Sequence, residues 1–202
     1  MTANTLVGRL ALRLFWQFNP ESYQRYLAKA FAGIPQDFSG RLLEVPVGTG
    51  ALSLPVYQSL PEAEIVCVDY SQNMLNIAQK RASYMGLSRV EFAVGDVSSL
   101  AYPEATYDAV LSVNGLHAFP DKEAALHETQ RVLKNGGIFT GCVYVKGENA
   151  LTDFFVRTFC SYRGYFTPPF DTAASLRARL SNFYQDVQVE TVGSFACFQC
   201  RK

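Results

Sequence analysis

Apolar residues along the chain follow two patterns: short continuous runs, and longer stretches in which they recur every three or four positions. Continuous runs are typical of strands buried on both faces of a parallel sheet, whereas the wider spacing is typical of helices that bury one face. The runs predict strands at residues 42–47, 65–68, 90–94, 107–113 and 138–145. The stretches between them predict helices at residues 51–60, 72–85 and 122–133. Strands that alternate with helices indicate an α/β fold with a mostly parallel sheet.

Capping residues support these helices. Ser71 and Gly86 bracket the second helix, and Asp121 precedes the third, which we expect to end at Asn135-Gly136-Gly137. Serine and aspartate accept hydrogen bonds from the free N–H groups of a first turn, and glycine readily takes the conformation that ends a helix. Pro55 falls in the first turn of the helix at 51–60, where a missing N–H does little harm.

The N-terminal segment is rich in aromatic residues. Helical spacing of apolar residues within 6–18 predicts one helix, and a second is expected at 21–31 after a break at Asn19-Pro20. The aromatic side chains of this segment either pack on the edge of the sheet or form part of a cover over a site, since an aromatic wall favours a cationic ligand. Tyr23 and Tyr26 are the candidates for such a cover.

The C-terminal part predicts the end of the sheet. Residues 146–170 are dense in phenylalanine and tyrosine, and the prolines at 168 and 169 interrupt any helix there. A helix at 172–183 and two strands at 187–192 and 195–201 follow. We expect the two strands to form an antiparallel hairpin that brings the sheet to seven strands.

Composition and charge narrow the class of protein. The chain has 202 residues, a length typical of one domain, and 49% hydrophobic residues are ample for a core. Eighteen basic residues balance eighteen acidic ones, so no broad attraction to nucleic acid or to an anionic membrane is implied. A long apolar span and a signal-peptide pattern are both missing from the sequence, which predicts a cytoplasmic protein without stable membrane insertion.

The five cysteines fit a reducing compartment. Cys197 and Cys200 form a C-x-x-C pair, but they lie in a predicted strand, where residues three apart face opposite sides of the sheet. We therefore expect no metal site there. Cys67 and Cys142 lie inside apolar strands and are expected to be small core residues.

The sequence R-L-L-E-V-P-V-G-T-G at 41–50 contains the strongest candidate site. The glycines allow a sharp turn at the end of a buried strand, which marks either a ligand site or a plain strand-to-helix connection. Asp69 ends the next apolar run, 19 residues after Gly50. That spacing suits an acid at the tip of the neighbouring strand, where its carboxylate can accept hydrogen bonds from ribose hydroxyls. Together the two features favour a nucleoside site.

Two further strand tips carry polar residues. Gly95-Asp96-Val97 follows the third strand, where Asp96 either caps a loop or accepts a hydrogen bond from an exocyclic amine while Val97 covers a flat base. His117 follows the fourth strand, at the edge where open α/β sheets hold ligands. It is therefore a candidate pocket residue and a candidate base, whereas His127 is expected at the surface of a helix.

In order, the motifs E-V-P-V-G-T-G, V-C-V-D-Y-S, V-G-D-V, Y-D-A-V-L-S-V-N-G-L-H and V-L-K-N-G-G-I-F resemble those of the class I S-adenosylmethionine-dependent methyltransferases. The series covers residues 41 to about 145 and is most similar to the branch that includes ubiquinone and menaquinone biosynthesis C-methyltransferases. The resemblance implies a doubly wound, mostly parallel seven-stranded Rossmann-like sheet with an antiparallel C-terminal hairpin, helices on both faces and an N-terminal helical cover.

The resemblance also implies a set of cofactor-binding residues. Those expected to frame the methionine part of S-adenosylmethionine are Glu44, Gly48, Gly50 and Asn114. Those expected to hold the adenosine are Asp69 at the ribose, Tyr70 against the adenine, Asp96 at its amine and Val97 beside the ring. One departure is Pro46, which stands where the family usually has glycine and which fixes φ and removes an N–H.

We expect a single methyltransferase domain over residues 1–202. Its parts are a helical N-terminal cover (1–38), a cofactor-binding core (41–145), an aromatic lid (146–170) and a last helix with the hairpin (171–202). The lid either covers the sheet or encloses an apolar acceptor, as lids of the resembled family do.

The expected reaction moves a methyl group from S-adenosylmethionine to a small, apolar or aromatic acceptor and leaves S-adenosyl-L-homocysteine. A phenol or acidic carbon would need a base, for which His117 is the candidate, whereas an amine, thiol or carboxylate would need none. No metal or nucleic-acid partner is expected, and a homodimer is possible. Two alternatives stay open. One is a non-catalytic S-adenosylmethionine-binding protein, and the other is an NAD(P)-dependent oxidoreductase, although Ser53 stands where the dinucleotide motif has its third glycine.

Overall fold

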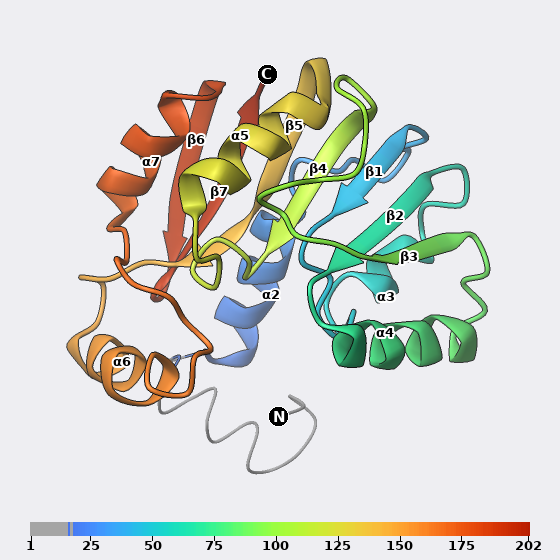
Figure 1. Cartoon of the computed structure of the whole chain (residues 1–202). Coiled ribbons are helices and arrows are strands. Elements are labelled where there is room, and N and C mark those ends of the chain that lie inside the picture. The colour runs from blue at the N-terminus through green and yellow to red at the C-terminus, as the bar shows by residue number, and fades with distance from the viewer. Residues whose placement is uncertain (1–15, 17) are drawn as a thin grey trace.

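The structure is a computed structural model that describes residue 16 and residues 18–202. The helix predicted within 6–18 therefore lies almost wholly outside the described residues. One seven-stranded sheet forms the centre of the molecule, with strand order β3-β2-β1-β4-β5-β7-β6 (Figure 1). The strands are β1 (Arg41–Glu44), β2 (Glu64–Asp69), β3 (Val90–Val94), β4 (Tyr107–Val113), β5 (Leu133–Tyr144), β6 (Gln185–Val192) and β7 (Phe195–Arg201).

The first five strands pair in parallel, and β7 pairs antiparallel with both β5 and β6. This confirms the predicted α/β class, with its mostly parallel sheet and its C-terminal hairpin. Because β1, β2 and β4 run in the same direction, the residues that follow them meet at one edge of the sheet, the lower edge in Figure 1.

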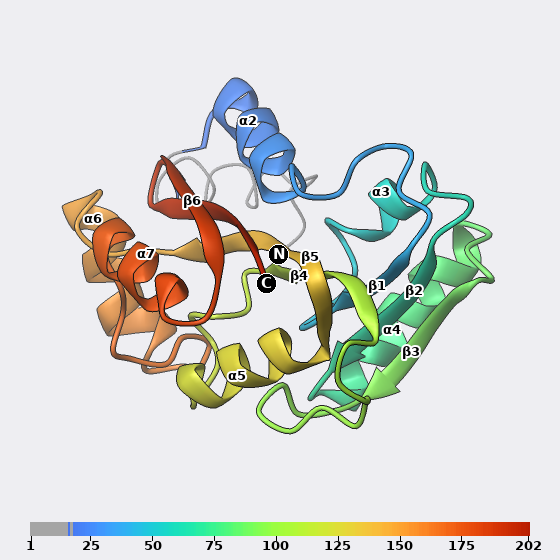
Figure 2. The same cartoon turned by 90° about the horizontal axis from the view of Figure 1, so that it is seen from above.

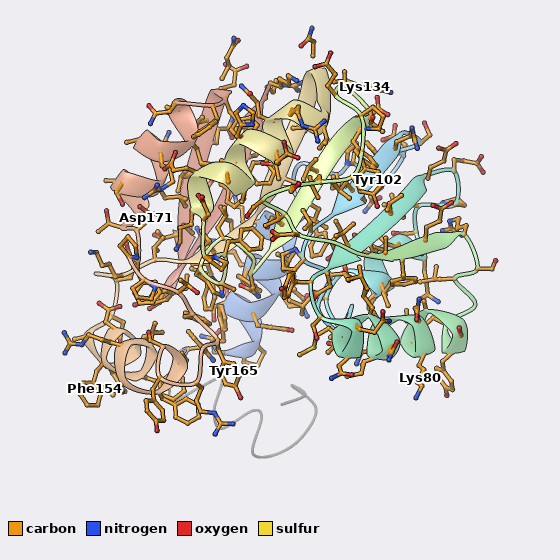
Figure 3. The ribbon with its side chains drawn as sticks, in the orientation of Figure 1. Lys80, Tyr102, Lys134, Phe154, Tyr165 and Asp171 are labelled. Atoms are coloured by element: carbon orange, nitrogen blue, oxygen red, sulfur yellow. The ribbon has the colours of Figure 1, made fainter. Side chains whose placement is uncertain are left out.

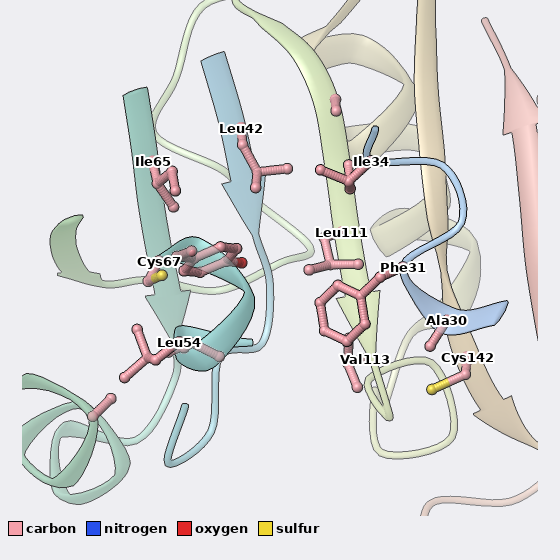
Figure 4. Packing of buried hydrophobic residues seen from close by; sticks show 14 of the residues in the cluster. Ala30, Phe31, Ile34, Leu42, Leu54, Ile65, Cys67, Leu111, Val113 and Cys142 are labelled. Atoms are coloured by element: carbon pink, nitrogen blue, oxygen red, sulfur yellow. The ribbon is translucent and has the colours of Figure 1, made fainter. Parts of the chain in front are cut away.

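Helices cover both faces of the sheet, with α2 and α5 on opposite sides (Figure 2). The helices are α2 (Pro20–Ala30), α3 (Leu54–Tyr57), α4 (Gln72–Tyr84), α5 (Lys122–Val132), α6 (Ala150–Phe155) and α7 (Ala173–Ser181), with a π-helical turn η1 (Val156–Cys160) after α6. Buried residues of α2, α3 and α4 pack on one face, around Leu42, Ile65 and Leu111 (Figure 4). Buried residues of α5 and α7 pack on the other, around Val110 and Phe139.

Several predicted elements are confirmed almost to the residue. Strands β3 and β4 have the expected bounds, and α4 begins at Gln72 with the Ser71 side chain accepting a hydrogen bond from the Met74 N–H at 3.4 Å. Asp121 caps α5 by accepting from the Ala124 N–H at 2.9 Å. Local signals were sufficient to predict where these elements begin, because the caps and the apolar periodicity indicate the same bounds.

Three predicted elements differ from the structure. The helix expected at 51–60 is reduced to the single turn α3, and β1 ends at Glu44 rather than at residue 47. The glycines after α5 do not end a helix before a new strand; β5 begins at Leu133, and Gly136, with φ +78°, lies inside it where the pairing with β4 shifts register.

The cysteines lie as predicted. Cys67 and Cys142 are fully buried in the core. Cys197 and Cys200 point to opposite faces of β7, since the first packs in the core beneath α2 and the second in the core beneath α5 and α7. Among the described helices, none is long and apolar enough to cross a membrane.

Candidate functional site

The turn after β1 is tied directly to the tip of β2. The Gly48 N–H donates to Asp69 Oδ2 at 2.7 Å, and the Ser71 N–H donates to Asp69 Oδ1 at 2.9 Å. Gly48 has φ +56° and open space around the position a Cβ would take, so its backbone conformation rather than crowding requires glycine. Gly50 has φ +63° and also lacks room, because a Cβ there would lie 2.5 Å from Leu54 Cδ1.

Glu44 is buried at the end of β1, with 1% of its surface exposed. Its Oε2 accepts a hydrogen bond from the Tyr57 hydroxyl at 2.8 Å and a weaker one from the Cys67 thiol at 3.5 Å. Burial disfavours the carboxylate and raises the pKa of Glu44 to about 8, against the opposing effect of the Tyr57 hydrogen bond. The carboxyl group is therefore mainly protonated at neutral pH.

The residues expected to hold the adenosine lie around the tips of β2 and β3. Tyr70 is 79% exposed beside Asp69, and the Gly95 N–H donates to the Asp69 carbonyl at 3.1 Å, which joins the two tips. Asp96 is exposed and accepts from the Ser98 N–H at 2.8 Å, whereas Val97 is buried against the core on the α5 face. The structure therefore brings Asp69, Tyr70 and Asp96 to one edge.

The tip of β4 is held by α2. Asn114 has φ +59°, and its side-chain amide donates to the Tyr26 hydroxyl at 2.8 Å. The Cys142 thiol donates to the same hydroxyl at 3.0 Å. Tyr26 is buried and Tyr23 is partly buried beside it, with ring centroids 6.2 Å apart. Tyr26 thus joins the N-terminal cover to the residue that follows β4.

His117 is buried between β5 and the aromatic segment after it. Its Nδ1 accepts a hydrogen bond from the Tyr144 N–H at 3.0 Å, and its ring stacks on Phe166 with centroids 3.9 Å apart. Burial, with a smaller effect from nearby Lys122, lowers the pKa of His117 to about 3, so the ring is neutral at physiological pH. Because Nδ1 accepts, the ring proton resides on Nε2, and in this arrangement His117 is a hydrogen-bond donor rather than a base.

The lid, residues 146–170, is fixed at both ends. Near its start, Asp153 accepts from the Tyr144 hydroxyl at 2.7 Å and from the Gly147 N–H at 2.9 Å. Near its end, the Thr167 N–H donates to the His117 carbonyl at 2.8 Å, and the buried Lys122 ammonium donates to the Thr167 carbonyl at 2.8 Å. The lid is thereby tied to the loop that carries His117.

Pro46 packs against the loop after β4. A Cβ on Gly115 would lie 2.4 Å from Pro46 Cδ and 2.4 Å from Ser112 Oγ. The proline ring thus occupies space that a glycine at 115 leaves free. The departure from the usual family pattern at 46 is matched by a small residue opposite it.

Sequence reasoning missed several residues that shape the site. Tyr57 and Cys67 contact the Glu44 carboxyl group, Arg81 donates from Nη1 to the Thr49 carbonyl in the glycine turn, and Lys122 holds the lid. No local pattern marks them, because each meets its partner only after distant elements have packed.

Comparison with known proteins identifies a related domain. Residues 42–137 match the model of a methyltransferase domain. A demethylmenaquinone methyltransferase from Thermus thermophilus is 40% identical over 97 residues, which cover 48% of this chain and 44% of that protein. The chain thus matches less than half the length of this relative.

Solved structures share the fold. Phosphoethanolamine N-methyltransferase 2 from Haemonchus contortus, in complex with S-adenosyl-L-methionine, has a TM-score of 0.75 at 17% identity over 100% of this chain and 58% of that one. The [4+2]-cyclase SpnF has a TM-score of 0.76 at 22% identity over 93% of this chain and 85% of that one. With the strand order, the parallel core and the match of residues 42–137, these likenesses lead to one conclusion: the chain has the class I S-adenosylmethionine-dependent methyltransferase fold, and its residues 42–137 match a methyltransferase domain.

Proposed function

We propose that this protein transfers a methyl group from S-adenosyl-L-methionine to a small, apolar or aromatic acceptor and releases S-adenosyl-L-homocysteine. One observation carries the proposal: the Gly48–Asp69 hydrogen bond joins the glycine turn to the tip of β2. Glu44, at the end of β1, and Asn114, directly after β4, lie at the same edge of the sheet. The proposal is supported by the match of residues 42–137 to a methyltransferase domain.

The residues at this edge suit an adenosine. Each Asp69 oxygen accepts one backbone N–H, which leaves lone pairs free for ribose hydroxyls. The exposed Tyr70 ring offers a face for the adenine, the Asp96 carboxylate can accept from its amine, and Val97 would lie beside the ring. The open space at Gly48 lets backbone approach the ligand.

The methionine part would lie at Glu44, Gly48, Gly50 and Asn114. When bound, S-adenosylmethionine supplies a methyl group already activated on a sulfonium. The chain therefore has to align donor and acceptor and keep water out. The lid, anchored at Asp153 and Thr167, and the N-terminal cover, joined to Asn114 through Tyr26, are suited to that task.

We further propose that His117 donates a hydrogen bond from Nε2 to an oxygen of the acceptor. A base role would require Nδ1, which already accepts from the Tyr144 N–H. This favours an acceptor with a phenolic or carbonyl oxygen near the methylated atom. Demethylmenaquinone is the first acceptor to test, because relatives are named demethylmenaquinone methyltransferase.

Two His117 variants separate donation from packing. His117→Phe keeps a flat ring beside Phe166 but loses the donor, and we expect turnover to fall roughly 100-fold, as for other lost donors to a reacting oxygen. His117→Gln keeps a donor and an acceptor and should retain part of the activity. Equal activity of the Phe variant and the parent would refute donation.

An NAD(P)-dependent oxidoreductase is the weaker alternative. Dinucleotide sites place the pyrophosphate at the N-terminus of a long helix after the glycine turn. In this chain that helix is α3, a single turn of four residues. Its N-terminus offers little of the positive electrostatic field that would attract a pyrophosphate.

A cofactor-binding protein without methyl transfer is the second candidate, because Pro46 alters the turn and because a protein of this fold is titled a [4+2]-cyclase. Calorimetry with S-adenosylmethionine, S-adenosylhomocysteine and NAD tests the cofactor, and mass-spectrometric detection of methylated product from an acceptor panel tests the reaction. Tight binding of NAD alone would overturn the proposal. Tight S-adenosylmethionine binding with conversion of the acceptor to an unmethylated product would favour the second candidate.

A further inference from the structure

Large hydrophobic side chains that are exposed fall into two groups among the described residues. One group surrounds α4 and the strand tips beside it: Tyr70, Met74, Ile77, Tyr84 and Val94. The other lies on the lid and is called the outer lid surface: Leu151, Phe154, Phe159, Tyr162 and Tyr165. Single exposed apolar residues are ordinary, but five within one short segment indicate a surface that is covered in use. Phe154 and Tyr165 lie at the lower edge of the molecule in Figure 3.

The lid also buries an inner apolar face. Phe166 packs between Trp16, at 5.9 Å between ring centroids, and Tyr144, at 5.6 Å. Phe170 contacts Tyr144 at 5.5 Å. The segment is therefore apolar on the side that meets the sheet and again on the side that meets solvent. A helical segment that is apolar all round is normally covered on both sides.

The charges on the outer lid surface are of one sign. Arg157 and Arg163 are exposed, and the Arg163 guanidinium lies 5.8 Å from the centre of the Tyr165 ring. The single acid between residues 151 and 165 is Asp153, whose carboxylate is turned to the Tyr144 hydroxyl and the Gly147 N–H. Between residues 151 and 165 the exposed surface thus combines aromatic rings with two arginines and no exposed carboxylate, and just before it the exposed Lys146 and Glu148 balance each other.

We propose that the outer lid surface docks onto an anionic phospholipid bilayer. Tyrosine and phenylalanine are favoured at the interface of a membrane, and arginine is attracted to anionic headgroups. The contact is peripheral, which agrees with the finding that no described helix is long and apolar enough to span a membrane.

The two other occupants within reach do not match this charge. A second copy docked through the same surface would bring two pairs of Arg157 and Arg163 into one interface, with no exposed carboxylate of residues 151–165 to neutralise them. Residues 1–15 of the chain carry Arg9 and Arg13 and no acid, so they offer no partner for these arginines either. The whole chain has balanced charge, from which we expected no attraction to anionic membranes. That average does not reflect the two arginines on the outer lid surface.

Vesicle flotation with the full chain tests the proposal. Vesicles of phosphatidylcholine alone are compared with vesicles that also contain phosphatidylglycerol, at low and physiological salt. We expect binding to the anionic vesicles that weakens with salt. The double variant Arg157→Glu/Arg163→Glu should lower the bound-to-free ratio by about tenfold or more, as expected for basic residues at an anionic surface.

Matched controls keep charge and composition equal. Arg25→Glu/Lys80→Glu makes the same change of net charge at exposed positions outside the lid. Phe154→Ser/Phe159→Ser should lower the bound-to-free ratio by about tenfold, whereas Ile77→Ser/Tyr84→Ser removes two exposed apolar residues from α4 and should leave it unchanged. Unfolding curves of the four variants confirm that each is folded.

Three results would overturn the proposal: no binding to anionic vesicles by the parent chain, equal binding by lid variants and controls, or a concentration-dependent dimer that the lid variants abolish. The last would assign the surface to a second copy. The assay needs neither cofactor nor acceptor, so its outcome is independent of whether the proposed methyl transfer is correct.

Discussion

Replacing Glu44 with glutamine should remove the loss of folding stability that the parent chain shows between pH 6.5 and 8. Burial raises the pKa of Glu44 in the folded protein from 4.5 to about 8. Between those values the folded state keeps a proton on Glu44 that the unfolded chain has lost, so the contribution of Glu44 to stability falls as pH rises. The slope is about 1.4 kcal/mol per pH unit, and the loss over the whole window is about 5 kcal/mol.

Urea unfolding at a series of pH values measures this effect. Below pH 6.5 the opposite contribution of His117, whose pKa is lowered from 6.5 to about 3, should hold the parent chain nearly level, and from pH 6.5 to 8 the parent should lose about 2 kcal/mol. Glu44→Gln should instead gain stability up to about pH 6.5 and stay level above it. Tyr57→Phe provides a second check with the opposite sign. The Tyr57 hydrogen bond lowers the pKa of Glu44, so its removal should extend the falling region above pH 8. Parallel curves for the parent and Glu44→Gln would refute the assignment of a buried, protonated carboxyl.

Three further substitutions test the site. Asp69→Ala should weaken S-adenosylmethionine binding by about 1–3 kcal/mol in calorimetry, because ribose hydroxyls and the Gly48 N–H lose their acceptor; an unchanged Kd would remove the ribose assignment. Tyr26→Phe should cost about 1–3 kcal/mol of unfolding free energy, because Asn114 and Cys142 lose a shared partner, while Tyr23→Phe serves as the matched control; equal loss in both would contradict it. Gly115→Ala should cost about 1–3 kcal/mol through the clash with Pro46, and an unaltered melting temperature would show that the two loops have room to spare.

Much of the parallel core could be predicted because local signals and the sheet agree. Strands β2, β3 and β4 are mainly apolar, and the caps at Ser71 and Asp121 define where the following helices begin. The side chains at the strand tips could be assigned to one edge because parallel strands share a direction.

The connections could not be predicted as well. The run after Gly50 has helical spacing, yet only Leu54–Tyr57 is helical, and turns precede and follow it at residues 51–53 and 58–59. The glycines after α5 look like a helix end, but the Gly136 N–H donates to the Lys202 carbonyl and the segment joins β5. The second outcome depends on a contact with a distant residue.

The chemistry of single groups was the least accessible from sequence. The motif suggested a base at His117, but only the packed structure reveals that the Tyr144 N–H occupies Nδ1. Likewise, the acid at 44 was expected, whereas its protonation results from burial, which raises its pKa more than the hydrogen bonds from Tyr57 and Cys67 lower it.

The lid is anchored at Asp153 and at Thr167, and between these anchors some side chains are buried while others face solvent. Asp153 and Thr167 attach the segment to β5 and to the loop after β4, and between them Val156 and Cys160 are buried in the core while Phe166 packs on Tyr144. The exposed side chains of the same stretch, among them Phe154, Phe159 and Tyr162, should therefore be exchangeable with little effect on folding. Proteins with this arrangement could differ in the exposed side chains between the two anchors while they keep the same sheet.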